Sequence, residues 1–217
     1  MFVTTSDNKR QGRPKSEEKR QQILSAASCL FLSEGFTNTS MDKVAKASGV
    51  SKQTVYSHYE NKDSLFQAAI SAKCQSYQLD TSQLMQASLK EMPFSTCLMH
   101  IGELFIRLLQ DPDTLAVFRV IIAESGSSEH MAELFYEAGP RASLRYIADI
   151  FHGYGDGAIS KQQSDQLAHD FVSLLKGDFH TMMLCGIQPA LTDEEIQNHV
   201  LNAVEKIVIW FDLYKNQ

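Results

Sequence analysis

A run of hydrogen-bonding side chains begins at Ser51 and is broken only by two residues suited to a protein interior, Val55 and Tyr59. Its members are Ser51, Lys52, Gln53, Thr54, Tyr56, Ser57 and His58, with Lys62 a few positions later. Ammonium, hydroxyl and imidazole groups bind phosphate oxygens. A glutamine amide pairs with adenine through two hydrogen bonds, and a threonine methyl contacts thymine. The run therefore favours nucleic-acid binding, with Gln53 and Thr54 at base edges.

Two short helices must position this run. Ser40, or Thr39 before it, suits the N-cap of a first helix whose apolar residues recur at helical spacing. Gly49 then permits a left-handed turn, and Ser51 suits the N-cap of a second helix. Such a pair, over residues 40–59, is the helix-turn-helix pattern. Two surface helices with a solvated polar face are the alternative.

The neighbouring segments share one continuous pattern with the motif. It reads Ile-Leu-x-Ala-Ala-x-x-Leu-Phe-x-x-x-Gly-Phe, then Thr-Ser-Met-x-x-Val-Ala-x-x-Ser-Gly-Val-Ser-Lys-x-Thr-Val-Tyr-x-His-Tyr-x-x-Lys-Asp-x-Leu. This pattern resembles the amino-terminal domain of TetR-type transcriptional regulators. Gln53 stands where many members have glycine, and Ser48 where alanine is usual. The resemblance implies a DNA-binding domain over residues 17–77, with Tyr56, His58 and Lys62 as phosphate anchors.

Charge is unevenly distributed along the chain. The formal net charge is −6, but residues 1–62 carry a balance of +4 and residues 63–217 a balance of −10. A basic segment that coincides with the motif is the electrostatic pattern of a DNA-binding region. Residues 1–16 are expected to form a flexible basic arm, in which Arg13 and Lys15 reach DNA. A solubilising tail is the alternative.

Other classes of protein find little support. The four cysteines, at 29, 74, 97 and 185, show no metal-ligand spacing, so we expect neither a metal nor a cofactor. Residues His100, His152, His169 and His180 form no catalytic or metal-binding pair, so we expect no catalytic residue, and an all-α enzyme is a remote reading. No apolar run approaches membrane-spanning length and no secretory signal is visible, so we expect a cytoplasmic protein that does not enter a membrane.

Helical periodicity continues to the end of the chain, which predicts an all-α protein with a larger helical domain over residues 78–217. Residues that break helices predict one helix over 62–86, which Asn61 can cap, and another from Pro93. They also predict helices from Asp111-Pro112 to Ser125-Gly126 and over 128–152, the second with a bend at Gly139-Pro140. A loop is expected over Gly153–Gly157. Helices over 164–186 and 193–214 close the chain, the second with a capping box of Thr192 and Glu195.

The carboxy-terminal region resembles the effector domain of the AefR-like branch of TetR regulators. The resemblance lies in Phe-Arg-Val-Ile-Ile-Ala-Glu (118–124) and Leu-Phe-Tyr-Glu-Ala-Gly-Pro (134–140). It implies a body that binds a small apolar or amphipathic effector. Candidate pocket residues are Tyr77, Phe94, His100, Phe105, Arg119, Glu124, Tyr136 and Met183. Ordinary core packing is the alternative for each of them, and Arg119 and Glu124, if buried, could then pair with each other or with a neighbour.

The last two predicted helices carry more apolar width than one partner covers, as in helices buried from two sides. The resemblance implies that they form the interface of a homodimer, which would bind a pseudo-palindromic operator. The assigned residues are Phe171, Leu174, Leu175, Phe179, Val200, Val204, Ile207, Val208 and Phe211. A repressor released by its effector is the expected function. An effector-independent regulator and an activator are the alternatives.

Overall fold

The computed structural model describes residues 17–79, 91–126 and 128–216, and every regular element in these ranges is helical. The elements are α1 (Glu17–Asn38), α2 (Met41–Ser48), α3 (Lys52–His58), α4 (Lys62–Ser76), α6 (Phe94–Gln110), α7 (Pro112–Glu124), α8 (Glu129–Tyr136), the π-helix η1 (Glu137–Arg141), α9 (Ala142–Gly155), α10 (Lys161–Lys176), α11 (Phe179–Leu184) and α12 (Asp193–Lys215). The all-α prediction is confirmed. The predicted arm, with Arg13 and Lys15, lies outside the described residues. Among those that are described, no helix is both long and apolar enough to cross a membrane.

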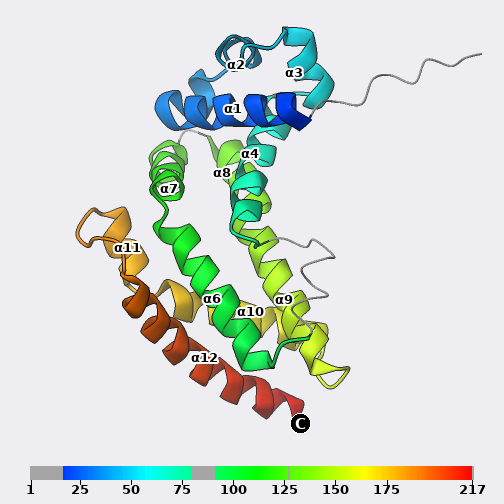
Figure 1. The fold of residues 1–217 in the computed structure, drawn as a ribbon, viewed down its shortest axis with the longest axis vertical. Coiled ribbons are helices and arrows are strands. Elements are labelled where there is room, and N and C mark those ends of the chain that lie inside the picture. The colour runs from blue at the N-terminus through cyan, green and yellow to red at the C-terminus, as the bar shows by residue number, and fades with distance from the viewer. Residues whose placement is uncertain (1–16, 80–90, 127, 217) are drawn as a thin grey trace, which may run out of the picture.

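Helices α1 to α4 form a head at one end of an elongated molecule (Figure 1). The expected caps are present, because the side chains of Ser40 and Asn61 each accept a hydrogen bond from a backbone N–H of the helix that follows. Gly49 ends α2 with a left-handed backbone, φ 70° and ψ 16°. Gly35 interrupts α1 at φ 78° and ψ 172°, a combination that essentially only glycine adopts.

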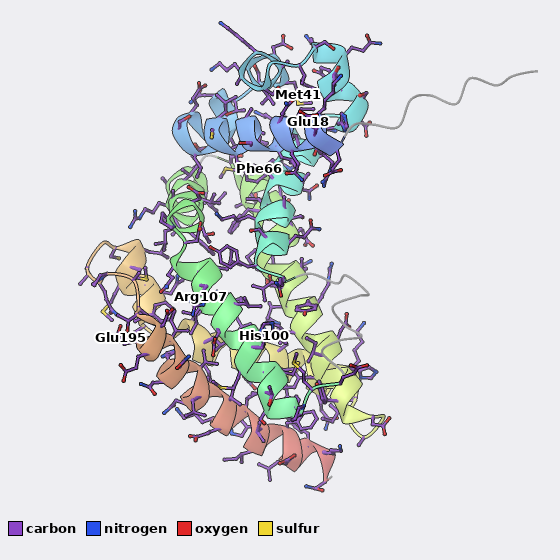
Figure 2. All side chains as sticks on the ribbon, in the orientation of Figure 1. Glu18, Met41, Phe66, His100, Arg107 and Glu195 are labelled. Atoms are coloured by element: carbon purple, nitrogen blue, oxygen red, sulfur yellow. The ribbon has the colours of Figure 1, made fainter. Side chains whose placement is uncertain are left out.

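The core of the head continues into the neighbouring helices of the body. The rings of Phe31 and Phe36 in α1 meet the Phe66 ring of α4 at centroid distances of 5.0 and 5.1 Å. Figure 2 shows Phe66 directly below α1. The same apolar cluster includes Met131 and Phe135 of α8. A substantial apolar contact therefore joins head and body, and the division near residue 77 stays a prediction.

The body is built on a second apolar cluster. Buried residues of α6, α9, α10 and α12 form its centre, with Tyr146, Phe151 and Phe171 as its largest fully buried side chains. At its edge, Arg107 of α6 forms a 2.7 Å ion pair with Asp193 at the start of α12. The predicted capping box of Thr192 and Glu195 is present. Helix α6 is thus tied to α12, and α7 connects it to the head.

Three predicted boundaries are wrong. The helix from Lys62 ends at Ser76, because Tyr77 caps it and Gln78 has φ 57°; residues 80–86 of the prediction lie outside the described residues. The expected loop at Gly153 is helical through Gly155, since a helix tolerates single glycines. The predicted helix over 164–186 is broken at Gly177, whose φ of 48° and ψ of −155° exclude a continuous helix.

The bend predicted at Gly139-Pro140 stays a prediction, but the type of helix changes at this point. There the chain forms η1, a single π-helical turn between α8 and α9. Proline has no backbone N–H and so cannot donate the hydrogen bond of a regular α-helical turn. A wider, π-helical turn accommodates it at this point. The turn lies against α4, where the Ser71 hydroxyl donates to the Ala138 carbonyl over 3.5 Å.

Candidate DNA-binding surface and junction cavity

Helix α3 begins at a serine that caps its own first turn. The Ser51 hydroxyl accepts from the Thr54 N–H over 3.1 Å, and its oxygen lies 2.8 Å from the Thr54 hydroxyl. Val55 is completely buried and Tyr59 nearly so, which anchors the helix to the head. The remaining side chains of residues 51–58, here called the α3 surface, are turned away from this anchor.

Two residues of the α3 surface have polar groups that are unused within the described chain. Gln53 is exposed and its amide makes no hydrogen bond there. Tyr56 is 45% exposed, although it is one of the larger apolar groups of the molecule. An exposed tyrosine and an exposed amide beside a helix N-terminus suit hydrogen bonding to DNA.

The other members of the α3 surface have local partners. The Ser57 hydroxyl donates to the Thr54 carbonyl over 2.8 Å, and the Thr54 hydroxyl is tied to Ser51. The Lys52 ammonium lies 2.7 Å from Asp42 of α2, and the hydrogen bond to this carboxylate raises the pKa of Lys52. Exposed pairs of this kind are weak, so a phosphate can replace Asp42. His58 is half-buried.

Lys62 is placed differently from the expected phosphate anchor. Its ammonium donates to the Phe36 carbonyl over 2.8 Å and lies 4.2 Å from the centre of the Phe36 ring. Helix α1 has no basic residue in its own last turn, and Lys43 donates to the Asn38 carbonyl in the same region. The two lysines satisfy carbonyls at the negative end of α1, a structural role that the sequence did not reveal.

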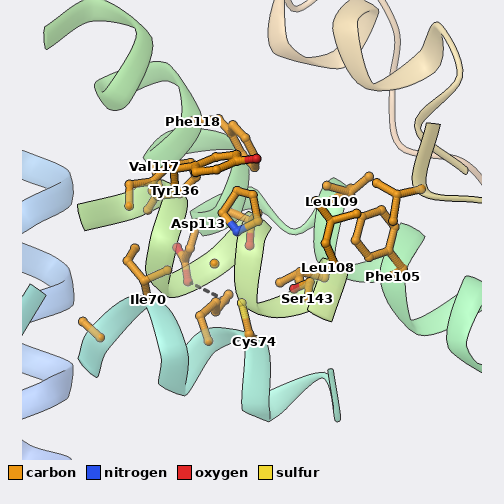
Figure 3. Close-up of a pocket in the computed structure, with 18 of the residues that line it drawn as sticks. Ile70, Cys74, Phe105, Leu108, Leu109, Asp113, Val117, Phe118, Tyr136 and Ser143 are labelled. Carbon is orange, nitrogen blue, oxygen red and sulfur yellow. Dashed lines mark hydrogen bonds and ion pairs between the residues drawn. The ribbon is translucent and has the colours of Figure 1, made fainter. Parts of the chain in front are cut away.

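A cavity of about 360 Å³ lies where the head meets the body, and we call it the junction cavity. Residues Ser28, Phe31 and Leu32 of α1 line it, together with residues of α4, α6, α7, α8, η1, α9 and α10. Figure 3 shows Ile70 and Cys74 of α4 on one side, with Val117 and Phe118 of α7 on another. Its volume falls in the range of small-molecule sites.

One wall of the junction cavity holds a compensated charge cluster. The Lys73 ammonium lies 2.7 Å from Asp111 and 3.2 Å from Asp113, and the Tyr77 hydroxyl donates to Asp111 over 2.9 Å. Although burial opposes ionisation of both groups, these hydrogen bonds raise the pKa of Lys73 and lower that of Asp111. Asp111 also caps α7 through the Thr114 N–H. Deeper in the wall, burial raises the pKa of the Cys74 thiol.

Only two of the residues predicted for the effector pocket, Phe105 and Tyr136, line the junction cavity. Phe94 instead stacks near Phe211, 4.2 Å between ring centres, at the far end of the body. Tyr77 is engaged with Asp111, and His100 is exposed on α6. These placements are corrections, since an aromatic or polar residue in a helix does not reveal which side of the helix borders a cavity.

Three further pocket candidates belong elsewhere. Arg119 is exposed and donates to the Met183 and Leu184 carbonyls over 2.9 and 3.0 Å, which caps α11 rather than pairing with Glu124. Met183 is buried in the body core and does not line the cavity. The Glu124 carboxylate lies against Gly35, where α7 meets α1.

The predicted dimer residues also need correction. Seven of the nine, all but Leu174 and Val208, are buried within the single chain. Helix α12 instead presents apolar side chains outward at Leu201, Ile209, Trp210 and Leu213, which are 47, 60, 39 and 60% exposed. Both faces of α12 are apolar, and the sequence did not show which face turns inward.

Among the described residues, no group of acidic, histidine and cysteine side chains is arranged to hold a metal ion. One buried histidine is notable: His180 is 6% exposed, and its Nδ1 has no hydrogen-bond partner in the described chain. Burial, with the nearby Lys176 charge, lowers its pKa to about 4. His180 is therefore neutral at physiological pH.

Comparison with known proteins gives both halves of the chain a family. Residues 23–69 match the bacterial regulatory proteins of the tetR family, and residues 96–212 match the carboxy-terminal domain of AefR-like transcriptional repressors. The HTH-type transcriptional regulator AcrR of Shigella flexneri is 39% identical over 57 residues, 26% of each chain. The chain thus aligns with only about a quarter of that relative's length.

Solved structures extend the likeness over nearly the whole chain. The Flavonoid-responsive Regulator FrrA is 30% identical, with a TM-score of 0.66 over 90% of this chain and 97% of that one. A TetR-family regulator from Mesorhizobium loti MAFF303099 has the same fold, with a TM-score of 0.70 at 24% identity over 91% of this chain and 98% of that one. With a capped α3 in a helical head and family matches in both halves, the chain belongs to the TetR family of DNA-binding transcriptional regulators.

Proposed function

We propose that this regulator is a cytoplasmic homodimeric repressor that binds a pseudo-palindromic operator and is released by a small effector in the junction cavity. The observation that carries the proposal is the composition of the cavity wall. Residues Phe31 and Leu32 of the head share it with residues of the body as far as α10. An occupant therefore contacts the DNA-binding head and the body at the same time.

The α3 surface is proposed to enter the major groove. Gln53 is exposed and unpaired in the described chain, so it is the strongest candidate for base reading, and Thr54 lies beside it. Ser51, Lys52, Tyr56, Ser57 and His58 are assigned to the phosphates, with Arg13 and Lys15 as contacts from the arm. Phosphate contacts supply most of the affinity, because each one releases condensed counterions.

Two copies are proposed to associate through α12. The outward-facing Leu201, Ile209 and Leu213 recur at intervals of eight and four residues, so they share one face of the helix. Trp210 borders that face. Large apolar groups exposed together on one helix mark an interface more often than a free surface. A two-fold dimer then presents two α3 surfaces to two half-sites.

Effector release follows if the cavity occupant prefers one orientation of the head. A ligand shifts such an equilibrium only through different affinities for the two orientations. Helix α4 is suited to transmit the change, because it carries Phe66 in the head core and Lys73 at the cavity wall. The match to AefR-like repressors favours repression. The name of FrrA makes flavonoids the first compounds to test.

The test has three readouts on the full chain. Selection of bound genomic duplexes should return a pseudo-palindrome. Light scattering should give a dimer that Trp210→Glu disrupts, while Lys46→Glu, an exposed position on α2 of the head, leaves it intact. A compound that raises the melting temperature should then release the selected operator. Binding of a compound without any change in operator affinity would refute the gating, and a monomeric wild type would refute the dimer.

A further inference from the structure

One wall of the junction cavity is a single face of α10. His169, Val172, Ser173 and Lys176 line it at helical spacing, so their side chains lie along the same stripe. Lys176, the last residue of α10, is half-buried. No carboxylate of the described residues lies within ion-pair distance of its ammonium. Burial accordingly lowers the pKa of Lys176.

The other lysine that lines the cavity, Lys73, has the carboxylate partners that Lys176 lacks. Lys73 has two carboxylates at 2.7 and 3.2 Å, so its charge is compensated inside the protein. His180, close to Lys176, is buried and neutral and supplies no counter-charge. A partly desolvated ammonium beside an apolar space is unfavourable unless an anion accompanies it. Lys176 is therefore a positive charge that the described chain leaves uncompensated.

We infer that the junction cavity binds an amphipathic organic anion, whose apolar body fills the space between α4, α6 and α7 and whose acidic group meets Lys176. The His169 ring, on the same stripe, is placed to add a hydrogen bond to this group, whereas the Ser173 hydroxyl already donates to the His169 carbonyl over 2.8 Å. Carboxylic acids, sulfonic acids and acidic phenols share this chemistry. The inference rests on the proposed function and narrows its effector from any apolar compound to an acid.

A matched pair of fluorescent dyes tests the inference. Anilinonaphthalene sulfonate and N-phenylnaphthylamine have the same aromatic rings, and only the first carries an anionic group. Each dye is titrated into the full-length protein. Lys176→Met should weaken binding of the sulfonate about tenfold, because it removes a charged hydrogen-bond donor, and should leave the neutral dye within about twofold.

Two control variants locate the effect. Lys161→Met removes an exposed lysine from the first turn of the same helix, outside the cavity, and should change neither dye. Val117→Trp adds bulk to the cavity wall and should abolish binding of both dyes while circular dichroism shows an intact helical fold. Sulfonate binding that survives Val117→Trp occurs at the surface and overturns the inference.

The remaining outcomes separate the inference from the proposed function. Equal affinities for both dyes, no effect of Lys176→Met, or no saturable binding of either dye would overturn the anionic specificity. Operator release is measured in parallel. Lys176-dependent binding without operator release would keep the anion site and refute the gating. Operator release that is independent of Lys176 would keep the gating and refute the anion site.

Discussion

The α3 surface and the junction cavity differ in how they are assembled. The first comprises consecutive residues on one short helix, which its own Ser51 caps. The second takes its walls from α1, α4 and six further elements that are far apart in the chain. Helical periodicity alone determines which side chains the α3 surface exposes, whereas the cavity depends on how every surrounding helix is rotated.

Two glycines show the same contrast at the scale of single residues. Gly49 has a left-handed backbone and open space around the position of a Cβ, so only the local turn requires it. Gly35 combines φ 78° with ψ 172°, and a Cβ there would overlap the Glu124 carboxylate of α7. One glycine serves its own turn, and the other serves a contact between head and body.

The largest expected effect follows from this difference. Gly35→Ala should lower the free energy of unfolding by roughly 3–4 kcal/mol, since both its backbone conformation and its surroundings exclude a side chain. Gly49→Ala should cost only about 1 kcal/mol, the penalty of a left-handed alanine. Urea denaturation followed by circular dichroism measures both. Equal losses would mean that the α1–α7 contact imposes no constraint.

The buried histidine of the body is expected to make stability depend on pH. The pKa of His180 falls from 6.5 to about 4 on folding, so between these values the unfolded chain binds a proton that the folded chain does not. The free energy of unfolding therefore falls by about 3 kcal/mol as the pH drops from 6.5 toward 4, and above pH 6.5, where both states are neutral, this penalty is absent. His180→Leu removes this penalty, so the free energy of unfolding of the wild type should fall relative to that of the variant by about 3 kcal/mol between pH 6.5 and 4. Parallel pH profiles would contradict the neutral buried state.

A smaller effect is expected at the α3 surface. Gln53→Ala should reduce discrimination at one or two positions of each half-site by about 1–2 kcal/mol, because one bidentate contact is lost. Tyr56→Phe is the comparison, since loss of a phosphate contact weakens all duplexes alike. Binding to a panel of operator variants distinguishes the two. An unchanged preference in Gln53→Ala would remove this residue from base reading.

The smallest effect concerns Lys62. Lys62→Met should lower the free energy of unfolding by about 1 kcal/mol, since it removes a cation from the α1 carbonyls and from the Phe36 ring. The salt dependence of operator affinity should stay unchanged. Lys46→Met, on the exposed side of α2, is the control for stability. A shallower salt dependence in Lys62→Met would restore the expected phosphate anchor.

Local features were the most predictable from sequence. The caps at Ser40, Ser51, Asn61 and Thr192 are confirmed, because each depends on hydrogen bonds within a few residues. At Pro140 the type of helix changes, where a bend was predicted. The break at Gly177 was missed, since an isolated glycine is compatible with both a helix and a break. Only the path of the flanking helices decides between them.

The cavity and the outward face of α12 were less predictable. Val204 and Ile207 turn inward on α12 while Ile209 and Leu213 turn outward, yet all four are equally apolar. Helical periodicity shows which side chains share one face of a helix, but it does not show which helix or chain that face packs against. Lys176 fell inside the predicted helix over 164–186, where no pattern marks it, and only the packing of α10 against the cavity distinguishes it. A site that many helices form together depends on how each helix is rotated about its own axis.

The support that α1 receives from Lys43 and Lys62 has a consequence for how the head is divided. Both ammonium groups come from later helices, and Phe66 of α4 completes the aromatic cluster beneath α1. A fragment that stopped after α3 would keep Lys43 but would lose Lys62 from the Phe36 carbonyl and would leave two phenylalanines uncovered. The smallest autonomous reader of DNA in this chain must therefore extend through α4, into the same helix that borders the cavity.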